Sequence, residues 1–384
     1  MTLGSRVHPR ALRSAHYGYV VAALGLLALL GAQGLGRFAY PLLLPAMRDA
    51  LELSYAQTGL LAGVNSGGYL VVSVFAGFVA ARHGPRRVVS VALAMTGVAM
   101  FFLAIAPTFL VALLAQFSVG VAMAFVTVPV MGMCSAWFAP SRRGLAAGIV
   151  AAGSGMGLIV TGAVVPLIYV AHGVDWWRFA WGYFGLAVFA LTLLTALLLR
   201  DRPRPGQARV GETAPAPPPA VAVKPSLFTP AVMRHPLVWY LSLLSGINTF
   251  AYVGFATFFA AYLMNERGVD PATTGALWSA AGLAALFSGL VWGVLSDRAG
   301  RKLAVALIFV VQIACFTIFT FSPSVLGYLV AALLYGLIAR ANFAVSAAAC
   351  GDIVGPALAP AAFGINAIGA AIGLVIGPVV AGPL

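Results

Sequence analysis

Charged residues are scarce in this sequence: Asp, Glu, Lys and Arg make up 8% of the 384 residues, and only nine residues are acidic. The three cysteines, Cys134, Cys315 and Cys350, have neither metal-binding nor redox spacing, so we interpret them as packing thiols. No nucleophile–base pair, metal-ligand cluster or phosphate-binding loop is evident in the sequence. We therefore expect no enzyme activity, no metal site and no cofactor.

Apolar residues, in contrast, make up 62% of the chain, and the mean hydropathy of +1.00 is far above that of soluble domains. A membrane-spanning helix needs about 20 apolar residues to cross roughly 30 Å of hydrocarbon. Eleven runs meet this requirement, at residues 17–47, 54–81, 88–105, 109–138, 144–169, 177–199, 237–263, 271–296, 303–321, 324–349 and 358–382. The sequence thus predicts an all-α polytopic membrane protein surrounded by a lipid bilayer.

Several motifs recur at an offset of 216 residues. The charged turn at residues 293–302, GVLSDRAGRK, has a degraded copy at residues 77–86, GFVAARHGPR. Three glycine pairs share this offset: Gly148 and Gly364, Gly153 and Gly369, and Gly157 and Gly373. This regularity predicts two pseudo-symmetric bundles of six helices. Because the counterpart of the sixth helix would fall beyond Leu384, we expect the twelfth helix to be missing from this chain.

The basic residues are distributed unevenly among the loops. The N-terminal tail and alternate loops contain 17 of the 22 Lys and Arg residues, whereas the opposite loops contain only Arg48, Arg178 and Arg267. Because cytoplasmic loops are enriched in Lys and Arg, we predict a bacterial inner-membrane protein with a cytoplasmic N-terminus. The net charge of +13 follows from this asymmetry, and no pattern typical of nucleic-acid binding accompanies it.

These observations divide the chain into four parts. Residues 1–16 form a cytoplasmic tail, 17–199 the N-terminal bundle, 200–235 a cytoplasmic linker and 236–384 the C-terminal bundle. The linker is polar and rich in proline, so we expect an extended tether.

The turn at residues 293–302 resembles the loop signature of the major facilitator superfamily (MFS) of secondary transporters, G-x-x-x-D-R-x-G-R-[RK]. Six residues match it: Gly293, Asp297, Arg298, Gly300, Arg301 and Lys302. The two six-helix halves joined by a cytoplasmic tether are also similar to that superfamily. In addition, GLGRFAYPLLLPAM in the first helix resembles the bacterial YbfB/YjiJ-type members. The resemblance implies the MFS fold and transport by alternating access.

The signature predicts a cytoplasmic gate. Asp297 is able to dock on a helix N-terminus of the other half, where free N–H groups carry partial positive charge. The repeat geometry implied by the resemblance makes the fifth helix that partner. The predicted gate comprises Gly293, Asp297, Arg298, Gly300, Arg301, Arg142 and Arg143. In the first-half copy Ala81 replaces the acid, so we expect an asymmetric gate. The alternative is that the positive cluster only determines topology.

Two arginines, Arg37 and Arg340, lie deep within the first and tenth apolar runs. Inserting a charge at such depth costs at least ~2.5–3.5 kcal/mol, so these groups normally face a cavity or a partner. In the superfamily helices one, four, seven and ten line the central cavity, and the resemblance therefore places both arginines there. No acidic residue lies in the spans, so we expect the substrate to supply the counter-charge. The alternative is that each arginine binds backbone carbonyls at a helix bend.

Polar residues near the two arginines complete the predicted substrate site: Gln33, Tyr40, Asn65, Asn248 and Tyr252. Asn65 belongs to a polar stripe that also includes Tyr69. Polar stripes in membrane helices usually join helices to one another, so we rank these residues below the arginines.

We predict a monomeric secondary active or facilitative transporter of a small organic anion, foremost a carboxylate, that acts by alternating access. Two alternatives remain. Aromatic and Met residues near the cavity suggest an MFS efflux pump for drugs or metabolites. The degraded first-half signature suggests a non-transporting membrane receptor or scaffold, because a fold does not determine function.

Overall fold

The computed structural model describes residues 9–139, 142–203, 209–211, 230–355 and 358–383. Within these ranges the regular secondary structure is helical, apart from one isolated bridge between Phe138 and Val210. Eleven helical segments are long and apolar enough to cross a membrane. The all-α class and the eleven predicted spans are therefore confirmed.

The N-terminal bundle contains six spans. The first is divided into α1 (Pro9–Leu29), the π-helical turn η1 (Leu30–Leu35) and α2 (Tyr40–Ala50). The other five are α3 (Tyr55–His83), α4 (Pro85–Ala104), α5 (Phe109–Trp137), α6 (Arg143–His172) and α7 (Trp176–Leu198), and the 3₁₀ turn η3 (Gly173–Asp175) precedes α7.

The C-terminal bundle contains five spans. They are α9 (Pro236–Ala261) with the π-helical turn η4 (Tyr262–Glu266), α10 (Pro271–Ala299), α11 (Arg301–Phe321), the pair α12 (Val325–Ile338) and α13 (Ala341–Val354), and α14 (Ala359–Ala381). The short helix α8 (Pro230–Met233) precedes them.

Corresponding turns in the two halves have the same geometry. Gly84 separates α3 from α4 with φ of 86°, and Gly300, 216 residues later, separates α10 from α11 with φ of 87°. Because L side chains rarely adopt this conformation, glycine allows both sharp reversals. The predicted repeat is therefore visible in the backbone.

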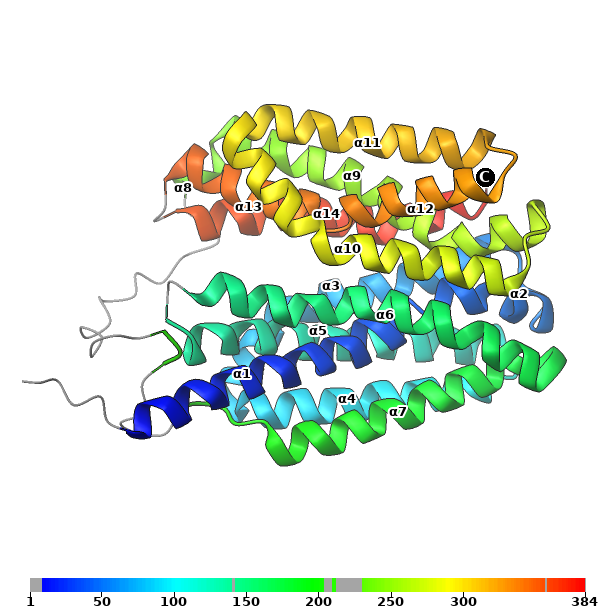
Figure 1. The fold of residues 1–384 in the computed structure, drawn as a ribbon, viewed down its shortest axis with the longest axis horizontal. Coiled ribbons are helices and arrows are strands. Elements are labelled where there is room, and N and C mark those ends of the chain that lie inside the picture. Colours follow the sequence, from blue (N-terminus) through cyan, green and yellow to red (C-terminus); the bar gives the residue numbers. More distant parts are fainter. Residues whose placement is uncertain (1–8, 140–141, 204–208, 212–229, 356–357, 384) are drawn as a thin grey trace, which may run out of the picture.

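The two bundles lie side by side with their helices roughly parallel (Figure 1). We call the end where α7 leaves for the linker the linker end, and the opposite end the far end. In the N-terminal bundle α4 packs against α7. Within the described chain, α11 has no helix in the corresponding position.

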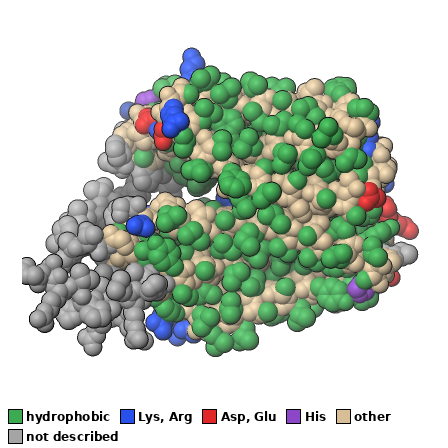
Figure 2. Space-filling model, viewed as in Figure 1, with side chains coloured by type: hydrophobic (Ala, Val, Ile, Leu, Met, Phe, Trp, Pro, Cys, Tyr) green, Lys and Arg blue, Asp and Glu red, His purple; other side chains and the backbone are tan. Residues whose placement is uncertain are grey.

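Helix contacts between the bundles are concentrated toward the far end. There α6 packs closely on α10. A Cβ atom added at Gly162 would collide with the carbonyl oxygen of Gly275, and one added at Gly275 would collide with the carbonyl oxygen of Gly162. Toward the linker end, no atom of the described chain outside the local helix lies within 4 Å of a Cβ position at Gly144, Gly148 or Gly293. The bundles thus touch at the far end and part at the linker end (Figure 2).

Described parts of the predicted linker contact the N-terminal bundle, as the Trp137 indole shows by donating to the Arg200 carbonyl oxygen. The Val210 amide donates to the carbonyl oxygen of Trp137, and the Ala139 amide donates to that of Val210, both at 3.0 Å. Val210 is buried, and its side chain lies against Gly18 of α1. The rest of the linker at residues 204–208 and 212–229, and residues 1–8 of the predicted tail, lie outside the described residues.

Candidate functional site

Both intramembrane arginines lie where a span is interrupted. After η1, residues Phe38 and Ala39 are not helical, and Arg37 immediately precedes this break. Arg340 lies in the turn between α12 and α13, where its backbone amide donates to Ser288 Oγ at 2.9 Å. Non-helical backbone at membrane depth requires such partners from the protein itself.

The two breaks bring together a cluster from both bundles. Arg37 lies near Tyr69 of α3, Tyr252 of α9 and Tyr335 of α12, and Arg340 lies near the first two of these. The rings of Tyr252 and Tyr335 stack with centroids 4.4 Å apart and an interplanar angle of 9°. We call these five residues the Arg/Tyr cluster.

The cluster has polar groups that the described chain does not satisfy. Arg37 is half-buried and makes no hydrogen bond or ion pair with any described residue. The Tyr335 side chain is fully buried, and its hydroxyl lies beside the Tyr252 side chain without a hydrogen bond of good geometry to the described chain. Leaving a buried donor without a partner costs about 1–3 kcal/mol. The cluster can therefore bind an acceptor-rich, negatively charged group.

Arg340 differs from Arg37 because the other bundle already binds its guanidinium. One of its Nη atoms donates to the carbonyl oxygen of Ala151 at 3.1 Å and also to Ser154 Oγ, and both acceptors are on α6. This geometry matches the alternative considered for the arginines, in which backbone carbonyls bind the guanidinium at a helix bend.

Among the other predicted site residues, only Tyr252 joins the cluster. Gln33 donates to Thr127 Oγ1 at 3.0 Å, and the Tyr40 hydroxyl donates to the Thr58 carbonyl oxygen at 2.8 Å. Two further hydrogen-bonded pairs each stay within one bundle: Asn65 with Gln116, and Asn248 with Gln312. These four residues join helices of the same bundle.

Tyr335 was not predicted as a site residue, and Tyr69 was noted only as part of a stripe. Tyr335 lies five residues before Arg340 in an otherwise apolar segment, so its place in the chain is the only sequence signal. Its role depends on stacking against Tyr252 from another helix.

The predicted gate residues bind within their own bundles. Arg301 donates to Asp297 at 2.6 Å and to Asp352 at 2.8 Å, and all three belong to the C-terminal bundle. On the other side, Arg142 donates to the Tyr19 hydroxyl at 3.5 Å, and Arg143 donates to the Phe138 carbonyl oxygen at 3.4 Å. Docking of Asp297 on α6 therefore stays a prediction for a conformation that is closed at the linker end.

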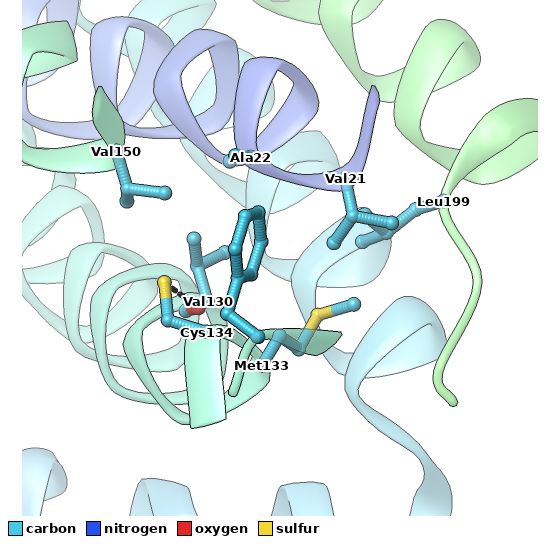
Figure 3. A pocket seen from close by; sticks show the side chains of 9 residues that line it. Val21, Ala22, Val130, Met133, Cys134, Val150 and Leu199 are labelled. Atoms are coloured by element: carbon cyan, nitrogen blue, oxygen red, sulfur yellow. Dashed lines mark hydrogen bonds between the residues drawn. The ribbon is translucent and has the colours of Figure 1, made fainter. Parts of the chain in front are cut away.

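Two cavities lie elsewhere. An apolar cavity of about 10 Å³ lies between α1, α5 and α6, with Val21, Val130 and Cys134 in its lining (Figure 3). This volume holds at most about one water molecule. A surface groove of about 600 Å³ adjoins α4 and α7 at the linker end, where the Arg86 amide already donates to Asp201 at 2.6 Å. Neither cavity includes Arg37 or Arg340.

Eleven membrane-spanning helices in two repeated bundles, with cationic groups between them, define a polytopic membrane protein built like the secondary transporters. The chain belongs to the Major Facilitator Superfamily, whose family model matches residues 26–378. The predicted family is thus confirmed, and so is the prediction that the chain is not an enzyme, because the superfamily consists of transporters. The YbfB/YjiJ-type subgroup stays a prediction.

The chain is similar to several curated transporters. It is 25% identical over 282 residues to a hexuronate transporter of Bacillus subtilis, which covers 70% of this chain and 62% of the relative. It is 24% identical over 274 residues to a probable sulfoacetate transporter of Cupriavidus necator, covering 67% and 60%. A nitrate transporter of Chlamydomonas reinhardtii is 26% identical, covering 69% and 49%. The matches thus span about three fifths of the first two relatives.

Solved structures share the fold. A bacterial homologue of the human lysosomal transporter Spinster, in an inward-facing and occupied conformation, superposes with a TM-score of 0.74 at 20% identity, covering 95% of this chain and 81% of that chain. The nucleoside transporter NupG, solved as a point mutant, has a TM-score of 0.72 at 16% identity, covering 94% and 91%. These similarities establish the MFS fold.

Proposed function

We propose that this protein is a secondary transporter that moves a small organic anion by alternating access. The observation that carries the proposal is Arg37: a guanidinium deep between the bundles without a hydrogen bond or ion pair to the described chain. A carboxylate matches the planar fork of a guanidinium and also accepts hydrogen bonds from hydroxyl groups. A bound carboxylate would therefore satisfy both Arg37 and the Tyr335 hydroxyl.

The names of the relatives support this substrate class. Hexuronate, sulfoacetate and nitrate are all anions, and the first two carry a carboxylate. The relatives diverge in the size of the substrate, so the support extends to its charge and not to its identity.

The charge distribution supports an orientation with the linker end in the cytoplasm. The helix ends on that side carry Arg82, Arg86, Arg298 and Lys302, whereas acidic residues such as Glu52 and Asp270 lie at the far end. By the positive-inside rule, the conformation described here is inward-open in the bacterial inner membrane.

Counterflow in proteoliposomes tests the proposal. Protein in vesicles preloaded with glucuronate or sulfoacetate should accumulate the same labelled anion, and Arg37→Gln should lower the initial rate at least tenfold, because the neutral amide lacks the counter-charge. Arg267→Gln is the matched control, since this arginine lies on the far-end surface and donates to Tyr262. Equal counterflow by the wild type and the Arg37 variant would contradict the proposal.

An efflux pump for amphipathic compounds is the second candidate. The observation that favours it is an aromatic group beside the cluster, in which Phe255 lies 5.0 Å from both Tyr335 and Phe316 between ring centroids. Dye transport by the same vesicles, without anion counterflow, would support this candidate. Neither activity would be expected of a receptor or scaffold.

A further inference from the structure

We propose that Trp278 is a positioning residue that holds the two bundles together at the far end and connects this contact to the Arg/Tyr cluster. The indole Nε1 of Trp278 on α10 donates to the carbonyl oxygen of Phe38 at 3.2 Å. Phe38 lies in the break of the first span, so the bond joins the C-terminal bundle to the N-terminal one. We call this hydrogen bond the far-end latch.

The break in the first span makes the Phe38 carbonyl available. In an uninterrupted helix this oxygen would accept from the amide of Leu42. Here the amides of Leu42 and Leu43 both donate to the Ala39 carbonyl oxygen, at 3.1 Å each. A buried carbonyl needs another partner, and Trp278, which is 0% exposed, supplies it. Rewinding of the first span would remove this acceptor from Trp278.

Each partner of the latch is next to a member of the Arg/Tyr cluster. Arg37 is the residue before Phe38, so a movement of its backbone also moves the Phe38 carbonyl. On the other side, the Trp278 ring lies 6.2 Å from Tyr335 between centroids, with an interplanar angle of 19°. Trp278 is seven residues from the far-end start of α10, or roughly 10 Å at ~1.5 Å per residue. It therefore lies between the cluster and the far end.

The latch exists once and is not duplicated by the repeat. The position equivalent to Trp278 in the first half is Ala62, and the position equivalent to Phe38 in the second half is Gly254, within the uninterrupted helix α9. Opening of the far end thus requires the loss of this particular bond. A ligand that changes the break at Arg37 would shift the equilibrium between open and closed far ends, provided that its affinity for the two states differs.

Trp278→Phe tests the latch, because it retains an aromatic ring and removes the donor. Trp292→Phe is a matched control: Trp292 is on the same helix, is also buried, and donates to the Leu337 carbonyl oxygen at 2.9 Å, but within its own bundle. Spin labels at Asp175→Cys and Glu266→Cys, one on each bundle at the far end, report the separation. The three native cysteines are buried and are replaced by alanine in this background.

Without any ligand, we expect Trp278→Phe to raise the population with a wide far-end distance about fivefold, the effect of losing one ordinary hydrogen bond, and Trp292→Phe to leave it unchanged. If Trp278→Phe does not fold, Trp278→Leu also lacks a side-chain donor and provides the same test. An unchanged distance distribution in a folded Trp278 variant, or an equal change in the Trp292 control, would overturn the proposal.

The connection to the cluster rests on the proposed function and is tested separately. Glucuronate and sulfoacetate should shift the far-end distances of the wild type and should not shift those of Arg37→Gln. If the ligand-free effect of Trp278→Phe is present but neither anion changes the distances of the wild type, the latch stands and the proposed anion site fails.

Discussion

At the scale of residues, the two intramembrane arginines differ in the partners of their guanidinium groups. Arg340 donates to Ala151 and Ser154 across the bundle interface, whereas Arg37 makes no hydrogen bond or ion pair within the described chain. The sequence is compatible with two roles for each arginine: binding the substrate, or binding backbone carbonyls at a helix bend. In the structure the two arginines differ. Arg37 retains free donors for a ligand, whereas Arg340 donates to α6.

Ser154→Ala tests the role of Arg340. The substitution removes one acceptor and leaves the Ala151 carbonyl, so we expect the apparent Tm in detergent to fall by about 1–2 °C. The population open at the linker end should fall as well, because the lost bond joins the bundles in this conformation. Ser118→Ala is the control, since this hydroxyl donates to Leu114 within its own helix. Equal shifts for both variants would contradict a cross-bundle role.

At the residue scale, the sequence is most informative where one side chain alone carries the information. A permanent charge inside an apolar run predicts an internal site without knowledge of the fold, and Arg37 and Arg340 do lie between the bundles. Polar residues such as Asn65 and Asn248 carry no such information, because their partners Gln116 and Gln312 come from other helices.

At the scale of elements, the helix breaks depend on distant partners. Pro129 and Pro166 lie inside α5 and α6 without interrupting them. The breaks at Phe38 and Arg340 are instead accompanied by hydrogen bonds to Trp278 and Ser288. Since these partners are remote in sequence, the eleven spans were predictable, whereas bends at the two arginines entered the sequence analysis only as an alternative.

The contact between α6 and α10 leads to a prediction at this scale. Gly275→Val would place side-chain atoms against the Gly162 carbonyl oxygen and the Pro166 ring. We expect the far end of this variant to open, as a several-fold rise in the labelling rate of a far-end cysteine at Ser279→Cys by a membrane-impermeant maleimide. Gly148→Val, at a position without neighbours within 4 Å in the described chain, should retain the wild-type rate. Equal rates in the Gly275 variant and the wild type would contradict this account of the contact.

At the scale of the whole molecule, the two halves share a framework and differ in their polar contacts. The turns at Gly84 and Gly300 are equivalent, yet among the described residues only the second-half turn carries the chain of ion pairs from Asp297 through Arg301 to Asp352. The far-end latch is likewise present only once. Under the proposed alternating-access mechanism, the two halves therefore have unequal roles.

The global architecture was predictable because hydropathy, repeat spacing and loop charge each report on the whole chain. The conformation was not predictable, because under the proposed alternating-access mechanism one sequence forms different contacts in each open state. The pairing of Val210 with the N-terminal bundle was not predictable either. A proline-rich composition predicts an extended linker and carries no information on which single residue becomes buried.

Direct binding measurements test the central claim, that Arg37 supplies the binding charge for an anion. Isothermal titration of the purified full chain with glucuronate and sulfoacetate should give saturable binding of at least one anion, and Arg37→Gln should weaken it at least tenfold, or about 1.4 kcal/mol. Arg37→Lys should restore part of the affinity, because it restores the charge without the planar fork. Binding of equal affinity to the wild type and Arg37→Gln, or no binding of either anion to the wild type, would contradict the account.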